Sequence, residues 1–392
     1  MTAIKEILKK ILLPVRKIYF DRLISNYFST DFKKRALIAY ITKPFLSQDR
    51  YFHSSFAESR VIAQIFNDLG YVVDIVNYDY GGQVDYEPYD IIFGFGPVFA
   101  KSFRQPTKPN IIKINYGTGT HPQVSNQKCR QRLEAVRDKK GRYILESVRL
   151  VEEDYLPQTT LAEAIVLIGN NYTADSYCRF FQGPIYQLPV SYYSFYDSNS
   201  IIANKDFTAA KKHFLFFTAG GMIHRGLDLL LEFFSQQADL HLHICCPMDL
   251  EPKFKKAYAA ELARPNIHYY GFINIKSAIF KTLINKCAFT ILLSCSEGQS
   301  GSVANVMGNG GLIPLLTKEV GYDIDKLGVA IDDFSVAAIA SAVQTAINKD
   351  NEELAAMSRL AAETSEARHS INAFADSFRE AIQNIIKNNI GK

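Results

Sequence analysis

Short apolar runs alternate with amphipathic stretches from residue 35 onward. The runs have the length and composition of buried strands, at residues 36–42, 71–77, 90–93, 110–115, 164–168, 185–188, 213–218, 240–246, 267–272, 288–294, 312–317 and 328–332. Between them lie helical patterns, such as those at residues 57–69 and 226–236, with apolar positions three and four residues apart. This alternation predicts an α/β protein whose parallel sheets are covered by helices on both faces.

The chain has 392 residues, more than a domain with a single hydrophobic core usually contains. We therefore expect two doubly wound, Rossmann-like domains facing a cleft, with ligands beyond the carboxyl ends of the strands. A polar, tyrosine-rich stretch before residue 213 predicts a linker. The predicted division is a basic amphipathic segment at 1–34, an N-terminal domain at 35–195, a linker at 196–212, a C-terminal domain at 213–370 and a final helix at 371–392 that can pack back on the N-terminal domain.

Composition and charge narrow the class of protein. The chain is 47% hydrophobic and 21% charged, as is usual for a globular protein, and its net charge of +4 is too small to indicate nucleic-acid binding. No run is long and apolar enough for a membrane span. The six cysteines have no CxxC pair or metal-finger spacing, which favours a reducing, cytoplasmic compartment.

Two basic segments stand out. The positive excess is concentrated in residues 1–22, where apolar residues form a helical stripe: Ile4, Ile7, Leu8, Ile11, Leu12, Val15 and Ile18. This stripe fits either a helix on the cytoplasmic face of an anionic membrane or a helix docked on the protein's own core. The second segment, residues 128–149, is predicted to be a helix with a solvated face, and the alternative is a grip on an anionic acceptor or lipid head group.

Residues 288–317 carry the clearest chemical signal. A buried strand is followed by the polar and glycine-rich loop 296–301, a short helix at 302–309 and a second buried strand. A strand, a glycine loop and a helix start present free backbone N–H groups to an anion. In the same loop, the carboxylate of Glu297 can accept hydrogen bonds from sugar hydroxyls. These residues predict a site for a phosphorylated sugar.

This stretch, together with FFTAGGMIHRGLDLLLEFF at residues 216–234, resembles the donor domain of retaining glycosyltransferases of the glycosyltransferase family 4 (group 1) type, which have the GT-B fold. The matching parts are the Gly220-Gly221 turn, Arg225-Gly226, Glu297-Gly298, position 305 and Leu312-Ile313-Pro314. Two positions depart from the family pattern: Asn305 replaces a glutamate that holds the ribose, and Gly220 replaces an arginine. Only one phosphate-loop cation, Arg225, is left.

The resemblance implies roles for individual residues. Arg225 would neutralise the leaving diphosphate, Glu297 would hold the transferred sugar, and His121, in the loop after the strand 110–115, would lie near the reacting sugar. The implied donor-binding set is Gly220, Gly221, Arg225, Gly271, Phe272, Glu297, Gly298, Gln299, Ser300, Gly301, Ser302 and Asn305. Phe272 can stack on the base, although a place in the core is the simpler expectation. Position alone suggests acceptor contacts for His53, Glu58, Thr118 and Gly119.

The sequence thus predicts a retaining glycosyltransferase that moves a sugar from a nucleotide sugar to a glycan or lipid-linked acceptor. The resemblance implies no cofactor and no metal, and His241 and His243, which share one face of a strand, lack an evident third ligand. No nucleic acid is expected as a partner. Two alternatives stay open: a nucleotide-sugar epimerase on the same fold, and a non-catalytic glycosyltransferase-like protein that binds a sugar or a partner enzyme.

Overall fold

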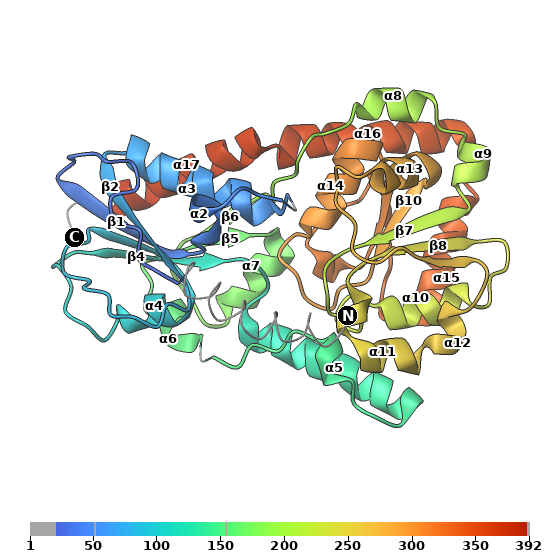
Figure 1. The fold of residues 1–392 in the computed structure, drawn as a ribbon, viewed down its shortest axis with the longest axis horizontal. Coiled ribbons are helices and arrows are strands. Elements are labelled where there is room, and N and C mark those ends of the chain that lie inside the picture. Colours follow the sequence, from blue (N-terminus) through green and yellow to red (C-terminus); the bar gives the residue numbers. More distant parts are fainter. Residues whose placement is uncertain (1–20, 51, 154, 390–392) are drawn as a thin grey trace, which may run out of the picture.

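A computed structural model describes residues 21–50, 52–153 and 155–389, and it shows two α/β domains side by side (Figure 1). Within these residues each domain contains one six-stranded sheet, and the paired strands are parallel. The predicted fold class, two doubly wound Rossmann-like domains, is confirmed. The amphipathic stripe predicted at residues 4–18 lies outside the described residues.

The N-terminal sheet has the strand order β2-β1-β3-β4-β5-β6. Its strands are β1 (Lys34–Tyr40), β2 (Tyr71–Asn77), β3 (Ile91–Gly94), β4 (Ile112–Gly117), β5 (Ala164–Ile168) and β6 (Ile185–Leu188). The central strands are buried along their whole length, as β3 and β5 show. Burial on both faces explains why these strands read as continuous apolar runs in the sequence.

The C-terminal sheet has the order β12-β11-β10-β7-β8-β9. Its strands are β7 (His213–Phe217), β8 (His241–Cys245), β9 (Ile267–Tyr269), β10 (Phe289–Leu292), β11 (Ile313–Leu316) and β12 (Val329–Ala330). The strand order reverses between β10 and β7, so the loops that leave these two neighbouring strands diverge to opposite faces and leave space between them.

Helices cover both sheets (Figure 1). In the first half of the chain they are α2 (Lys43–Leu46), α3 (Ser54–Asp68), α4 (Gly96–Lys101), α5 (Pro122–Lys140), α6 (Leu156–Thr160) and α7 (Asn171–Cys178). In the second half they are α8 (Ser198–Ala203), α9 (Phe207–Ala210), α10 (Leu227–Phe234), α11 (Pro252–Ala257), α12 (Ala259–Leu262), α13 (Ala278–Lys286), α14 (Gly301–Gly310), α15 (Val336–Ile347), α16 (Asn351–His369) and α17 (Ile371–Asn389). The segment expected to be a linker therefore contains α8 and α9, and both pack on helices of the C-terminal domain.

The last two helices run along one side of both domains (Figure 1). Helix α16 packs on the C-terminal domain, against α14 and β11, whereas α17 packs on α3, β5 and β6 of the N-terminal domain. Phe378 of α17 lies edge-on to Phe93 at 5.3 Å between ring centroids, and Arg379 pairs with Asp68 at 2.6 Å. The apolar face of α17 thus has its partner in the first half of the chain.

Helix α5 lies on the opposite side of the molecule and reaches the C-terminal domain (Figure 1). Its basic side chains pair with carboxylates of that domain: Lys128 with Glu319 at 3.1 Å, Arg132 with Asp228 at 2.5 Å, Lys139 with Glu232 at 2.6 Å and Lys140 with Glu261 at 2.9 Å. The predicted helix is present as far as Lys140, and residues 141–149 lie outside it. The expectation of a solvated face is wrong for Arg132, which is buried, and for the half-buried Lys128 and Lys140, whereas Lys139 is exposed as expected. These ion pairs join the two domains.

Candidate active site

Loops from the carboxyl ends of both sheets meet between the domains. The loop after β10 touches the loop after β4, because the carbonyl oxygen of Glu297 accepts hydrogen bonds from N and Oγ1 of Thr120, at 3.1 and 2.8 Å. The loops after β7 and β10 are also joined, since N of Cys295 donates to the carbonyl of His224 at 2.8 Å. The two turns on which the sequence prediction rests are therefore neighbours.

Arg225 and Glu297 form an ion pair at this junction, between Nη1 and Oε1. Both side chains are largely enclosed, with exposed fractions of 6% and 14%. Oε1 of Glu297 also accepts a hydrogen bond from Oγ of Ser294 at 3.0 Å, and Nε of Arg225 donates to the carbonyl of Gly220 at 3.2 Å. These bonds hold the guanidinium and the carboxylate toward each other.

Both groups keep their charges near neutral pH. Burial is the largest single influence and favours the neutral acid at Glu297, but the charge of Arg225, together with smaller effects that include Arg149 and the hydrogen bond from Ser294, lowers the pKa of the carboxyl group. Burial lowers the pKa of Arg225 to about 10, with Glu297 opposing the change. The site therefore offers one enclosed cation and one enclosed carboxylate.

The glycine turn before Arg225 holds a carboxylate of the protein itself. N of Gly221 and N of Met222 donate to the two carboxylate oxygens of Glu251, at 2.5 and 3.0 Å. Glu251 comes from the loop after β8 and is 4% exposed. The amides of Gly221 and Met222 are thus engaged by Glu251, and the binding of a diphosphate at this turn stays a prediction.

Arg149 supplies a second cation that the sequence reading missed. A methyl group placed on Gly221 would lie 3.6 Å from both Cγ and Nε of Arg149, so this exposed side chain extends over the turn. Its charge also lowers the pKa of Arg225. It escaped prediction because it lies in the charged segment of the N-terminal half, 76 positions before Arg225, where only the fold reveals its neighbour.

His53 faces the same space from the N-terminal domain. It precedes α3 and accepts a hydrogen bond from N of Ser55 at 3.3 Å. Desolvation by the surrounding protein lowers its pKa, Asp49 opposes the change, and the charges of Arg149 and Arg225 add to it. The charges of Arg149 and Arg225 thus influence His53 across the domain junction, and its contact with an acceptor stays a prediction.

The glycine loop after Glu297 packs against the N-terminal domain. A Cβ on Gly298 would lie 3.1 Å from Cα of Gly119 and 3.0 Å from the carbonyl oxygen of Thr118, and the carbonyl of Gly298 accepts from Oγ1 of Thr173 at 3.3 Å. Oε1 of Gln299 accepts from N of Val190 at 3.0 Å. Two predicted acceptor positions, Thr118 and Gly119, therefore lie directly against the predicted donor loop.

Helix α14 starts at this junction. Ser300 is its N-cap and Gly301 its first residue, and no side chain caps the first turn. A Cβ on Gly301 would lie 3.1 Å from Oγ of Ser54 in the N-terminal domain. Ser302, the second residue of the helix, is half-buried. The positive end of α14 therefore points into the space between the domains, where it favours an anion.

Asn305 has both polar atoms of its side chain engaged. Oδ1 accepts from N of Tyr193 at 3.1 Å, and Nδ2 donates to the carbonyl of Gly301 at 2.7 Å. Asn309, one turn later, accepts from N of Phe195 at 2.7 Å and donates to the carbonyl of Tyr193 at 2.8 Å. The two amides fix the segment that connects the domains, and the ribose contact of Asn305 stays a prediction.

The loop after β9 exposes the residues expected near the nucleotide base. Phe272 is 54% exposed, so the expectation of a place in the core is wrong. Gly271 has φ +73, and a Cβ added to it would have no heavy atom within 4 Å, so its surface is open. The ring of Phe272 is accessible for stacking, and its contact with a base stays a prediction.

His121 and Glu58 are buried inside the N-terminal domain. His121 accepts from N of Gln123 at the start of α5, faces Oγ1 of Thr159 at 3.2 Å, and stacks on Phe180 at 4.1 Å. Burial lowers the pKa of His121 to about 4, so its ring is neutral near pH 7. These contacts give the ring a structural role, and the role implied by the resemblance stays a prediction.

Glu58 lies under the segment that connects the domains. Its Oε1 accepts hydrogen bonds from N and Oγ of Ser191, at 2.8 and 2.9 Å. Burial raises the pKa of Glu58 to about 7 although these bonds oppose the change. The side chain is 1% exposed, and its predicted acceptor contact is untested.

His241 and His243 belong to a row of histidines across three strands. Nδ1 of His213 lies 3.0 Å from Nε2 of His243, and Nδ1 of His241 lies 3.2 Å from Nε2 of His268. Burial is the main cause that lowers the pKa of each ring. The neighbouring rings of His213 and His268 come from β7 and β9, the strands on either side of β8. The alternation of residues within one strand could not predict them.

No protein-family model matches the sequence, and the comparison with curated proteins gives no match. Solved structures do match the fold. HepE from Anabaena, in complex with UDP and glucose, is 11% identical with a TM-score of 0.54, over 90% of this chain and 100% of HepE. The chain has the GT-B fold.

Two further structures have the same architecture. The N-terminal domain of Candida albicans trehalose-6-phosphate phosphatase is 10% identical with a TM-score of 0.55, over 91% of this chain and 97% of that domain. TarM of S. aureus is 13% identical with a TM-score of 0.51, over 75% of this chain and 54% of TarM. This chain therefore corresponds to about half of TarM. At these identities the likeness establishes the GT-B fold alone.

Proposed function

We propose that this GT-B protein is a glycosyltransferase that moves a sugar from a nucleotide sugar to a glycan or lipid-linked acceptor, with retention of the anomeric configuration. The observation that carries the proposal is the ion pair of Arg225 and Glu297 at the domain junction, with Arg149 beside the same turn. The nucleotide sugar would bind to the C-terminal domain. The acceptor would approach from the side of His53 and residues 118–119.

In this mechanism the diphosphate takes the place of Glu297 beside Arg225. The guanidinium groups of Arg225 and Arg149 neutralise charge that grows on the diphosphate as the sugar–phosphate bond breaks. Glu297, released from Arg225 and ionised, accepts hydrogen bonds from the sugar hydroxyls. The departing phosphate takes the acceptor's proton, and the new bond forms on the same face of the sugar. No metal ion takes part in this step.

The test begins with ligand binding. A thermal-shift panel of uridine, guanosine, thymidine and adenosine diphosphates and their sugars should give one class that raises the melting temperature. UDP and UDP-glucose come first, because HepE was crystallised with both. A ligand at a hundred times its dissociation constant adds about 2.7 kcal/mol of stability.

Turnover of the donor that binds then tests the residues. Arg225→Ala and Glu297→Gln should each lower kcat by about a hundredfold, because each removes charge that acts on the transition state. Arg149→Ala should also lower turnover, and Arg142→Ala is its matched control, since Arg142 is exposed in the same segment. Wild-type rates in the first two variants would contradict the site. A product with inverted anomeric configuration would contradict the mechanism.

One observation favours a second candidate, a non-catalytic glycosyltransferase-like binding protein. The carboxylate of Glu251 occupies the amides of Gly221 and Met222, where a phosphate would otherwise be held. If this carboxylate excludes the donor, wild-type protein will bind no nucleotide, and Glu251→Gln will bind one. Nucleotide binding by the wild type would favour the enzyme.

The proposed location is the cytoplasmic face of a membrane, with residues 1–22 in contact with its surface. Its support is the basic amphipathic pattern of that segment. Among the described residues, no helix combines the length and apolar character that crossing a bilayer requires. Binding of the full chain to vesicles of anionic lipid, lost when Lys5, Lys9 and Lys10 are replaced by glutamate, would support this location.

A further inference from the structure

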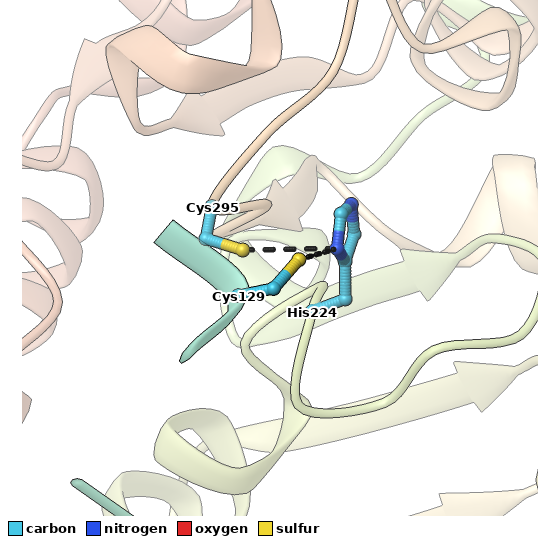
Figure 2. Close-up of side chains that lie close together, drawn as sticks. All are labelled: Cys129, His224 and Cys295. Carbon is cyan, nitrogen blue, oxygen red and sulfur yellow. Dashed lines mark hydrogen bonds between the residues drawn. The ribbon is translucent and has the colours of Figure 1, made fainter. Parts of the chain in front are cut away.

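Two buried cysteines and a buried histidine meet beside the Arg225–Glu297 pair. Cys129 comes from α5, His224 from the turn after β7 and Cys295 from the loop after β10. Figure 2 shows both sulfur atoms directed at the same edge of the His224 ring. Three segments far apart in the sequence thus place three metal-binding side chains together, which no spacing motif could have revealed.

The distances among these side chains suit one small cation. Sγ of Cys129 lies 3.2 Å and Sγ of Cys295 lies 3.7 Å from Nδ1 of His224, and the three donor atoms are within 4.8 Å of one another. A tetrahedral Zn²⁺, with Zn–S of about 2.3 Å and Zn–N of about 2.0 Å, holds its donor atoms about 3.5–3.8 Å apart. The two sulfur–nitrogen distances are within a few tenths of an ångström of this spacing.

The histidine is already oriented as a metal ligand. Its Nε2 lies 2.7 Å from the carbonyl oxygen of Ser296. A carbonyl oxygen only accepts hydrogen bonds, so Nε2 carries the hydrogen and Nδ1 turns its lone pair toward the two sulfur atoms. Metal-bound histidines commonly donate their second N–H to a backbone carbonyl in this way, which fixes the tautomer and the plane of the ring.

A shared histidine distinguishes these two thiols. Sγ of Cys129 and Sγ of Cys295 both face Nδ1 of His224, so two buried sulfur atoms from different segments converge on one ring nitrogen. Cys245 and Cys287 are also buried, but neither belongs to this group of metal-binding side chains.

We propose that Cys129, His224 and Cys295 form a binding site for one thiophilic divalent cation such as Zn²⁺. Binding forms two metal–sulfur bonds and one metal–nitrogen bond and releases the two thiol protons. The two thiolates balance the two positive charges, so the buried site stays neutral. The fourth position is left to water. The ion would join α5 to the loops that carry Arg225 and Glu297, and it has no part in the proposed transfer step.

The experiment measures metal binding to the full chain, in the absence of nucleotide, so that its outcome is separate from the test of the enzymatic function. Reduced, chelator-treated protein is titrated with Co²⁺ and then with Zn²⁺. We expect one Co²⁺ per chain with a thiolate-to-cobalt charge-transfer band, and its loss when Zn²⁺ displaces the cobalt. Cys129→Ala and Cys295→Ala should each weaken binding at least tenfold.

Two cysteines provide matched controls. Cys178→Ala removes an exposed thiol and Cys245→Ala a buried one, and both should bind cobalt as the wild type does. The proposal is overturned if wild-type protein gives no charge-transfer band, a result that does not depend on any variant folding. It is also overturned if Cys129→Ala binds as tightly as Cys178→Ala, or if the two sulfurs form a disulfide that, once reduced, takes up no metal.

Discussion

Removal of one partner from the ion pair between Arg132 of α5 and Asp228 of α10 should cost more stability than removal of a partner from any of the other three ion pairs that join α5 to the C-terminal domain. The two side chains are 6% and 1% exposed and lie 2.5 Å apart. Replacing Arg132 by alanine leaves the buried carboxylate of Asp228 without its counter-charge. Loss of one partner from such a pair costs about 3–5 kcal/mol, and we expect a loss of that size in the free energy of unfolding.

A surface pair on the same helix is the matched control. Lys139 and Glu232 lie 2.6 Å apart with 45% and 19% of their side chains exposed. Such pairs contribute about 0–1 kcal/mol, so Lys139→Ala should change stability little. Urea unfolding can be followed by circular dichroism and by tyrosine fluorescence, because the chain contains 22 tyrosines and no tryptophan. Coincidence of the two probes checks whether the domains unfold together.

The double variant Arg132→Met/Asp228→Leu replaces both charged side chains by apolar ones. It therefore separates the net contribution of the ion pair to the free energy of unfolding from the cost of leaving one charge buried without its partner. Nε of Arg132 and Oδ1 of Asp228 have no hydrogen-bond partner among the described residues, so the pair is incompletely satisfied. We therefore expect the double variant to regain most of the stability that Arg132→Ala loses. A loss below about 1 kcal/mol for Arg132→Ala, equal to that of Lys139→Ala, would refute the reasoning.

Three further predictions concern stability. Glu58→Gln should stabilise the protein by about 3 kcal/mol at pH 8 and change its stability little at pH 4. Because the folded pKa of Glu58 is raised to about 7, the unfolded chain releases a proton that the folded chain keeps, and stability is lost as pH rises from the unfolded pKa toward 7. Equal effects at both pH values in chemical denaturation would contradict this. Burial lowers the pKa of His243 to about 3 and that of His213 to about 4, so below pH 6.5 the unfolded chain binds protons that the folded chain does not, and stability should fall as pH drops. His243→Phe should reduce the slope of unfolding free energy against pH by up to about 1.4 kcal/mol per pH unit. An unchanged slope would exclude His243 as its source. Gly226→Ala should lower the melting temperature, because Gly226 has φ +74 and the added Cβ would lie 2.5 Å from Cβ of Leu293. The left-handed backbone alone costs about 1–2 kcal/mol. Gly81→Ala is the control, since a Cβ added to Gly81 would have no heavy atom within 4 Å.

The sheets could be predicted because burial on both faces leaves a direct trace in the sequence. The run at residues 71–77 coincides with β2 and the run at 164–168 with β5. Strand ends were predicted less well: the run at 267–272 gives only Ile267–Tyr269, since Phe272 turns outward. Local pattern thus determines which segments form strands, and contacts beyond the strand determine where each ends.

Parts of the candidate site could be anticipated only where one segment carries both the loop and its chemical groups. Glu297 and the turn before Arg225 could be identified because strand, glycine and helix follow one another in the chain. Arg149 could not be identified in this way, since its position over Gly221 depends on how α5 and the residues after it reach the other domain. Glu251, which accepts hydrogen bonds from the Gly221 turn, likewise cannot be predicted from local motifs, because it belongs to a different loop.

Helix α5 and the crossing chain segments lie on opposite sides of the molecule, so the two domains are tied together on both sides (Figure 1). On one side the two crossings are hydrogen-bonded to each other, N of Tyr192 to the carbonyl of His369 at 2.9 Å and Nδ1 of His369 to the carbonyl of Val190 at 3.0 Å. On the other side, a rotation that moved α5 away from the C-terminal domain would part Arg132 from Asp228. Salt screens exposed pairs but hardly affects an enclosed one, so raising ionic strength would leave this pair in place.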